Sequence, residues 1–297
     1  MNNMHEKPFG VQASLITPFD NAGNVKEDAF RKHISWQIES GVHGIGVGPN
    51  TGEFVNLQFT DIKKVVDIAV DEVHGRIPVT VGALSASMRD NLDIIKYAKE
   101  AGATYVLVQA PYYLPPAKDK LVDYFKVLAS AKMPMIIFNH PYKTPFNLTP
   151  EMISKLFDIE EFVSVKEVDM NMGNNVMRLE CLHNGGRTYL MGEEYMTLYH
   201  YLHGGDGCFP ALGNISPSLC VDLYNYCKAG NYEEAIRVNF ELLELGNAVY
   251  VENYPSGIKE AMTMIGRDGG VTREPVGRVS SSSLEKIKVA LKKINLI

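Results

Sequence analysis

The chain has 297 residues, of which 45% are apolar and 22% are charged. This composition is ordinary for a globular protein, so it predicts a sizeable buried core and excludes extensive disorder. The formal net charge of −6, without any run of basic residues, argues against a nucleic-acid partner and favours a small molecule.

The N-terminal residues, the cysteines and the histidines indicate the compartment of the protein and whether it binds a metal. Residues 1–8 contain no apolar segment, and no window approaches the roughly 20 apolar residues of a membrane span. We therefore expect a cytoplasmic protein with no membrane partner. Neither Cys-x-x-Cys nor zinc-ribbon spacing occurs, and no carboxylate motif accompanies His200 and His203, so no metal is expected. We expect buried thiols, not disulfides, at Cys181, Cys208, Cys220 and Cys227.

Short β-like runs alternate with amphipathic helical runs along almost the whole chain, a pattern typical of a parallel sheet with crossover helices. Eight strands are predicted, at Val11–Thr17, Gly44–Val47, Pro78–Val81, Tyr105–Gln109, Met135–Phe138, Val163–Lys166, Thr188–Met191 and Gly207–Phe209. Eight is the number of strands that closes a (β/α)8 TIM barrel. We therefore expect an α/β fold of that kind.

Helices are predicted between the strands and after the last one. Asn24 and Thr60 are expected to begin helices that end before Gly41 and Gly75. After strand eight, further helical stretches are predicted at Pro217–Lys228, Tyr232–Tyr250 with Ser256–Ile265, and Ser283–Ile294. No linker divides the chain. We expect residues 1–216 to hold the barrel strands and the first seven helices, and residues 217–297 to add the final barrel helix and a C-terminal helical extension to the same structural unit.

Lys166 ends the sixth predicted strand, and in a βα barrel the reacting groups come from the carboxyl ends of the strands. Burial there makes an ammonium group costly, lowers its pKa and leaves a neutral amine that can attack a carbonyl. A single lysine at a strand end is more often a solvated head group on an apolar stem. The neighbouring strand ends decide between these interpretations.

The turn at residues 48–53, after strand two, is rich in glycine, so its backbone N–H groups could face a small anion such as a carboxylate. An ordinary Gly/Pro/Asn turn is the alternative. The turn is neither a Walker loop nor a dinucleotide fingerprint. Tyr112 and Tyr113 follow strand four, where aromatic side chains serve in packing or as acid/base groups.

Four motifs at these strand ends together resemble the dihydrodipicolinate synthase and N-acetylneuraminate lyase family. They are Gly-x-x-Thr-Gly-Glu at residues 48–53, Pro-Tyr-Tyr at 111–113, Asn-x-Pro at 139–141 and Val-Lys-Glu at 165–167. The resemblance extends over nearly the entire chain. It implies a class I lyase that forms a Schiff base with pyruvate or a related 2-oxo acid, uses no external cofactor and assembles as a homotetramer.

The resemblance also implies roles for single residues. Lys166 would be the imine-forming lysine, and Tyr113 would match the tyrosine of the family's proton relay. Thr51 would serve in the relay and help to hold the substrate carboxylate. The backbone around Asn50 and Gly52 would complete the carboxylate site.

Two positions depart from the family pattern. Phe138 stands where the family has a proton-transferring tyrosine, and losing a positioned acid or base typically lowers a rate about 10²–10⁴-fold. Either another group replaces the phenol, or the activity is reduced or altered. Lys143 stands where synthases carry an arginine, and it supplies charge without the bidentate fork. We still expect both residues, and Phe209 in the segment that matches the strand-eight loop, to contact the substrate.

These departures favour a relative with a different electrophile over true dihydrodipicolinate synthesis. The leading prediction is aldol-type formation or cleavage of a carbon–carbon bond between a 2-oxo acid and an aldehyde. One alternative is a sugar-acid dehydratase that uses the same imine, with Glu193, Glu194 and Asn214 holding hydroxyl groups. Another is a 2-oxo-acid-binding barrel that has lost turnover.

Overall fold

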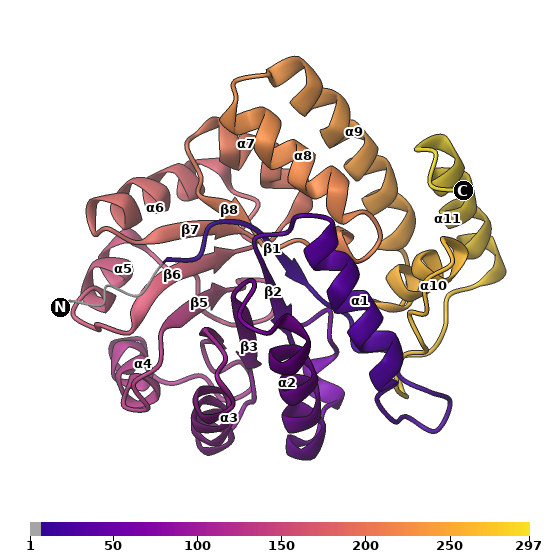
Figure 1. Cartoon of the computed structure of the whole chain (residues 1–297). Coiled ribbons are helices and arrows are strands. Elements are labelled where there is room, and N and C mark those ends of the chain that lie inside the picture. The colour runs from indigo at the N-terminus through magenta and orange to yellow at the C-terminus, as the bar shows by residue number, and fades with distance from the viewer. Residues whose placement is uncertain (1–6) are drawn as a thin grey trace.

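Eight parallel strands form a closed barrel in the computed structural model, which describes residues 7–297 (Figure 1). The strands follow one another around the barrel in chain order, and β8 pairs with β1 to close it. They are β1 Gly10–Ser14, β2 Gly44–Val47, β3 Val79–Ala83, β4 Tyr105–Gln109, β5 Met135–Asn139, β6 Phe162–Glu167, β7 Thr188–Met191 and β8 Gly207–Cys208. The predicted TIM barrel is confirmed, and the predicted strand ends differ from the observed ones by no more than three residues.

Helices α1 to α7 each follow the strand of the same number and surround the barrel, and α8 follows β8 (Figure 1). Helices α9 to α11 form the predicted C-terminal extension. The bounds are α1 Glu27–Glu39, α2 Phe59–Val73, α3 Met88–Ala101, α4 Leu121–Ala129, α5 Pro150–Leu156, α6 Met172–Asn184, α7 Thr197–Leu202, α8 Pro217–Lys228, α9 Tyr232–Val249, α10 Ser256–Met264 and α11 Ser281–Lys293. Within the described residues, none of the helices is long and apolar enough to cross a membrane.

The strands are buried on both faces, which explains their nearly continuous apolar sequences. Every residue of β4 and β5 is buried. The outer faces pack against the apolar stripes of the helices, such as Ile62 and Val66 on α2. A second cluster includes Leu84, Tyr105, Leu107, Ile136, Phe138, Val163, Leu190 and Phe209. This second cluster places two aromatic rings, those of Phe138 and Phe209, beside the candidate site.

The helix ends were predicted better than the helix starts. Gly41 and Gly75 have φ angles of 81° and 71°, the left-handed conformation in which glycine is favoured after a helix. Asn24 lies outside α1, and Thr60 lies inside the first turn of α2. Gln58 caps α2 instead, in a reciprocal capping box with the third residue of the helix.

The C-terminal extension is tied to the loops at the carboxyl ends of the strands. Lys259 on α10 donates hydrogen bonds from Nζ to the carbonyls of Thr17 and Val271, at 2.7 Å each. Its Nζ also lies 2.5 Å from Oε1 of Glu53, in the turn after β2, and both side chains are buried. These bonds hold the segment between α9 and α10 over the barrel mouth. The division at residue 216 stays a prediction.

The cysteines follow the prediction in part. All four are free thiols, and Cys208 and Cys220 are buried as expected. Cys181 on α6 and Cys227 on α8 are only half-buried.

Candidate active site

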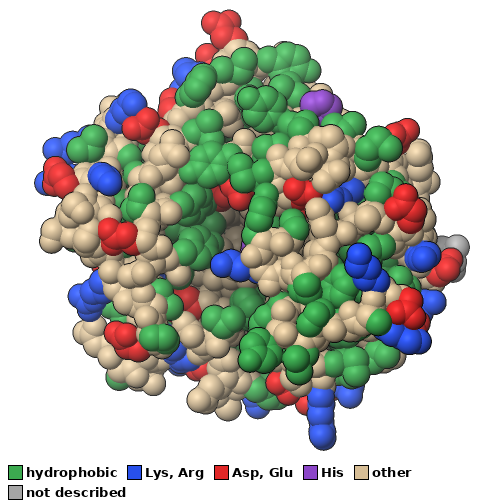
Figure 2. All heavy atoms as spheres, turned by 180° about the vertical axis from the view of Figure 1, so that it is seen from behind, with side chains coloured by type: hydrophobic (Ala, Val, Ile, Leu, Met, Phe, Trp, Pro, Cys, Tyr) green, Lys and Arg blue, Asp and Glu red, His purple; other side chains and the backbone are tan. Residues whose placement is uncertain are grey.

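A cavity of about 630 Å³ opens at the carboxyl ends of the strands. Its walls come from β1, β4, β5 and β6, from the loops after β2, β7 and β8, and from the segment between α9 and α10. Figure 2 shows the face behind that of Figure 1, which is hollowed near its middle, with hydrophobic, acidic and basic side chains around the hollow. Barrel enzymes place their reacting groups at this end of the strands.

Lys166 projects into this cavity from β6 and is only 4% exposed. Strand pairing sets it beside Phe138 of β5. Its Nζ lies 4.4 Å from the ring centroid of Phe138 and 4.6 Å from that of Phe209. Burial lowers the pKa of Lys166 to about 8, against the opposing charges of Glu194 and Glu193. The side chain is therefore closer to the neutral, nucleophilic form than an exposed lysine.

Glycines make room for the lysine and for one of its aromatic neighbours. A Cβ at Gly192 would lie 2.6 Å from Cε of Lys166, and a Cβ at Gly46 would lie 2.5 Å from Cε1 of Phe209. No real Cβ sits that close to another carbon, so larger residues at either position would displace a side chain that lines the cavity.

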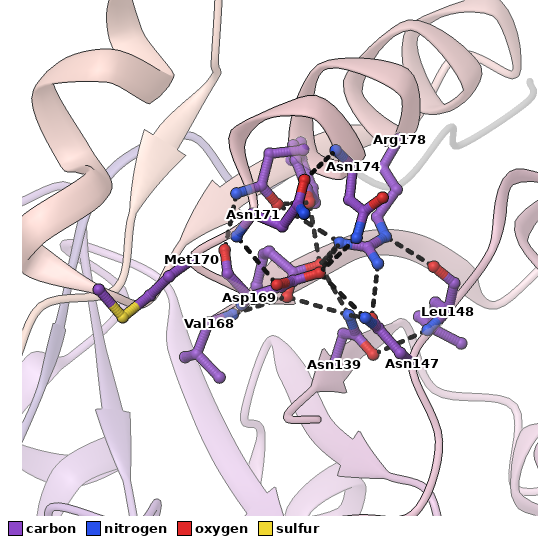
Figure 3. A network of polar contacts seen from close by, with 12 residues as sticks. Asn139, Asn147, Leu148, Val168, Asp169, Met170, Asn171, Asn174 and Arg178 are labelled. Atoms are coloured by element: carbon purple, nitrogen blue, oxygen red, sulfur yellow. Dashed lines mark hydrogen bonds and ion pairs between the residues drawn. The ribbon is translucent and has the colours of Figure 1, made fainter. Parts of the chain in front are cut away.

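A polar network fixes the strand end behind Lys166 (Figure 3). Glu167, which is fully buried, accepts hydrogen bonds from Nδ2 of Asn139 at 2.8 Å, from the hydroxyl of Tyr189 at 2.9 Å and from Nη1 of Arg178 at 3.1 Å. The same Arg178 nitrogen lies 3.0 Å from Oδ2 of Asp169. Buried carboxylates are stable when paired and hydrogen-bonded in this way. The network anchors the backbone from which Lys166 projects.

The turn after β2 forms another wall of the cavity. Thr51 is 2% exposed, and its Oγ1 lies 2.9 Å from Oγ of Ser14 and 2.7 Å from the hydroxyl of Tyr254. Asn50 lines the cavity beside it, whereas Gly52 is buried behind the turn and accepts a hydrogen bond through its carbonyl. Within residues 7–297, no hydrogen bond uses the backbone N–H groups of Asn50 and Thr51, which both line the cavity. They are available to a small anion.

Two glutamates from the loop after β7 complete the site. Oε1 of Glu194 accepts hydrogen bonds from the backbone N–H groups of Ala211 and Leu212 and from the hydroxyl of Tyr250, so this carboxylate is held in place. Burial and the neighbouring Glu194 raise the pKa of Glu193 to about 7. Glu193 is therefore able to give or take a proton near neutral pH.

The structure brings most of the predicted residues together. The cavity is lined by Lys166, Thr51, Asn50, Lys143, Phe138 and Phe209. Tyr113 is outside the lining and 80% exposed, and its neighbour Tyr112 faces the cavity instead. In the single chain, therefore, Tyr113 does not reach Lys166. Asn214 is also not at the cavity rim, because it is fully buried and its amide bonds Ile16 and Ser14 inside the fold.

Sequence reasoning missed the residues that the C-terminal extension contributes. Tyr250 and Tyr254 line the cavity although they lie more than 80 residues after Lys166. The only local signal was a Tyr-Pro pair, Tyr254-Pro255, in the break between two predicted helices. Such a pair is compatible with many turns.

The chain is similar to known proteins over its whole described length. A sequence model of the dihydrodipicolinate synthetase family matches residues 7–294. A 4-hydroxy-tetrahydrodipicolinate synthase of Brucella suis is 34% identical over 290 residues, which are 97% of this chain and 99% of that protein.

Solved structures give the same result. A dihydrodipicolinate synthase from Acinetobacter baumannii, solved in complex with pyruvate, has a TM-score of 0.93 and 25% identity, covering 98% of this chain and all of the other. A structure described as a monomeric dihydrodipicolinate synthase variant has a TM-score of 0.95 and 27% identity, and both chains are covered completely.

Proposed function

The chain belongs to the dihydrodipicolinate synthetase family and is a class I, dihydrodipicolinate synthase-like lyase, and we propose that Lys166 forms a Schiff base with pyruvate or a related 2-oxo acid. The observation that carries this proposal is the burial of Lys166 at the carboxyl end of β6, with a pKa lowered to about 8, in a cavity that also contains the Thr51 turn.

In the proposed reaction, the neutral amine of Lys166 attacks C2 of the 2-oxo acid. The resulting carbinolamine loses water and becomes an iminium, which makes the C3 protons acidic, and removal of one of these protons gives an enamine. The substrate carboxylate binds the N–H groups of Asn50 and Thr51, which fixes C2 close to Nζ of Lys166. The enamine then adds to an aldehyde, or the reverse sequence cleaves the same bond. Lys143, at the exposed rim of the cavity, offers a positive charge for an acidic second substrate.

One observation favours a second candidate, dehydration of a sugar acid. Glu193 lies beside Lys166 with a pKa of about 7, so it can protonate a hydroxyl group that the enamine expels, which then leaves as water. Turnover of hydroxylated 2-oxo acids alone, without turnover of pyruvate with aldehydes, would select this candidate. Turnover of pyruvate with an aldehyde would select the aldol reaction.

Trapping of the imine tests the proposal. The protein is incubated with pyruvate, reduced with borohydride and digested, and the peptides are mapped by mass. We expect a reduced pyruvyl adduct on Lys166 and none in Lys166→Ala. Lys259 is an internal control, because it is also buried with a lowered pKa but is bonded outside the cavity. No adduct with pyruvate or with longer 2-oxo acids would mean that Lys166 is structural and that the chain is a non-catalytic barrel.

We also propose that the chain assembles as a homotetramer. Tyr113 and Leu114, after β4, are 80% and 82% exposed, and large exposed apolar side chains often mark a contact surface. Sedimentation velocity tests the assembly. The alternative outcome is a monomer, the state for which one similar solved structure is named.

A further inference from the structure

Within residues 7–297, the two phenols on the barrel strands, Tyr105 of β4 and Tyr189 of β7, do not line the cavity that contains Lys166. The rings closest to its Nζ belong to Phe138 and Phe209, and neither ring can transfer a proton. Formation of an imine nevertheless requires a proton for the departing oxygen and a base for the nitrogen. The group that moves these protons must come from elsewhere in the cavity wall.

Tyr254 is placed to do so through its contact with Thr51. Its hydroxyl lies 2.7 Å from Oγ1 of Thr51, which lies 2.9 Å from Oγ of Ser14, so three hydroxyl groups form a chain along the cavity wall. In a 2-oxo acid the carboxylate carbon is bonded directly to C2. A group that is hydrogen-bonded to the carboxylate-binding turn is therefore close to the oxygen on C2.

Among residues 7–297, the other acidic groups of the cavity have different partners or, like Tyr112, make no hydrogen bond to the Thr51 turn. The hydroxyl of Tyr250 donates to Glu194 at 2.7 Å, and that of Tyr195 donates to Asn247 at 2.9 Å. Burial lowers the pKa of His140 to about 4, so its imidazole is neutral and a weak acid at neutral pH. Glu193 remains a competitor, but no hydrogen bond in the described part of the chain links it to the Thr51 turn.

The Tyr254 ring is held in position by its own segment. It packs against the ring of Tyr250, with 5.9 Å between the ring centroids. Although 40% of Tyr254 is exposed, its hydroxyl contacts buried Thr51. Burial raises the pKa of Tyr254, against the hydrogen bond that it shares with Thr51. The phenol therefore keeps its proton at neutral pH, until a more basic oxygen forms beside it.

We propose that Tyr254 is the proton-transfer residue of this site and supplies the phenol that Phe138 lacks, an inference that rests on the proposed Schiff-base function. As Lys166 Nζ bonds to C2, the carbonyl electron pair moves to oxygen, which takes the proton of Tyr254. The phenolate recovers a proton from the nitrogen. The phenol then protonates the C2 hydroxyl group, which leaves as water while the nitrogen lone pair forms the iminium. The phenolate finally takes a proton from C3, which yields the enamine and restores the phenol.

The test separates the rate of imine formation from its final extent. The protein is mixed with saturating pyruvate and quenched with borohydride at timed intervals, and the fraction of Lys166 that is reduced is measured by mass. In Tyr254→Phe we expect the same final fraction, reached about 10²-fold or more slowly. Adding Phe138→Tyr to that variant should restore part of the rate, because the new hydroxyl stands beside Lys166.

Matched variants identify the cause. Tyr226→Phe removes a hydroxyl group on α8, outside the cavity, and should react like the unmodified chain. Thr51→Val leaves the phenol in place without its hydrogen bond, and it should also slow the reaction.

Three results would overturn the assignment. The first is a Tyr254→Phe rate within about threefold of the unmodified rate. The second is a lower final fraction of reduced Lys166 in Tyr254→Phe at an unchanged rate, which would show a positioning role only. The third is a slow reaction in Glu193→Gln but not in Tyr254→Phe. If the unmodified protein forms no adduct, the proposed Schiff-base function itself is refuted, and this outcome is distinct from the other three.

Discussion

The ammonium form of Lys166 meets two opposing effects in the cavity. The faces of Phe138 and Phe209, at 4.4 and 4.6 Å, attract a cation, and so do the charges of Glu194 and Glu193. Loss of hydration acts in the other direction and is larger, because the pKa of Lys166 falls to about 8. At pH 7 the Lys166 amine is then neutral in about a tenth of the molecules, a far larger fraction than for an exposed lysine.

The pH dependence of imine formation follows from this balance. The initial rate of adduct formation with pyruvate should rise with pH through about 8, as the Lys166 amine loses its proton. In Glu193→Gln the rising limb should move to lower pH, because a negative charge that favours the ammonium has been removed. Glu234→Gln, in an exposed ion pair on α9, serves as the control. If the rising limb of the Glu193→Gln profile stays in place or moves to higher pH, the charge of Glu193 does not raise the pKa of Lys166.

The buried lysine should also lower stability. The difference between the ordinary pKa of 10.5 and about 8 corresponds to roughly 3 kcal/mol, at about 1.4 kcal/mol per pH unit. Lys166→Met should therefore unfold with a free energy larger by roughly 1–3 kcal/mol at pH 7, in urea titrations followed by circular dichroism.

The sign of the effect can be checked through pH. Between about pH 8 and 10.5 the folded chain releases the Lys166 proton before the unfolded chain does, so the stability of the unmodified protein rises relative to Lys166→Met. The advantage of Lys166→Met should shrink across this window. An advantage that is absent at pH 7, or that grows with pH, would mean that the lysine is not desolvated.

At the scale of single elements, the carboxyl end of β6 depends on the ion pair between Arg178 of α6 and Glu167. Both side chains are buried. Arg178→Met leaves the carboxylate of Glu167 without its cation, which should lower the free energy of unfolding by about 3–5 kcal/mol. Arg237→Met breaks an exposed pair on α9 and should cost less than about 1 kcal/mol. Similar losses in the two variants would show that the network does not support β6.

How far the elements could be predicted depends on the range of the interactions that form them. The barrel strands are apolar runs that local sequence is enough to identify. Lys166 ends one of these runs and Thr51 lies in the turn after another, so both residues could be found from the sequence. Which of Tyr112 and Tyr113 faces inward depends on the path of the chain after β4, which local pattern does not set. The start of α2 was missed because Gln58, a weaker signal than Thr60, forms the capping box.

At the scale of the whole molecule, the C-terminal extension is part of the site. Thr51 and Tyr254 are 203 residues apart in sequence, yet their hydroxyl groups are hydrogen-bonded. Lys259 holds this segment through Thr17 and Glu53. No local pattern could predict such contacts, because they arise only when the barrel has closed and the extension has packed on it.

The extension and the barrel should therefore unfold together. Trp36 is the only tryptophan, and it lies on α1 of the barrel, with the guanidinium of Arg267 from the extension 3.5 Å from its ring centroid. In urea, Trp36 fluorescence and helix content by circular dichroism should change in coincident transitions. If the Trp36 fluorescence changes at a lower urea concentration, while much of the helix content by circular dichroism is retained, the extension is a separate unit.

The central claim is that Lys166 binds a 2-oxo acid covalently while the Thr51 turn holds its carboxylate. A crystal structure of the protein with pyruvate tests it most directly. We predict continuous electron density from Nζ of Lys166 to C2 of pyruvate, with the carboxylate on the N–H groups of Asn50 and Thr51 and the Tyr254 hydroxyl near C2. Pyruvate bound without a bond to Lys166, or with its carboxylate away from the turn, would contradict the account.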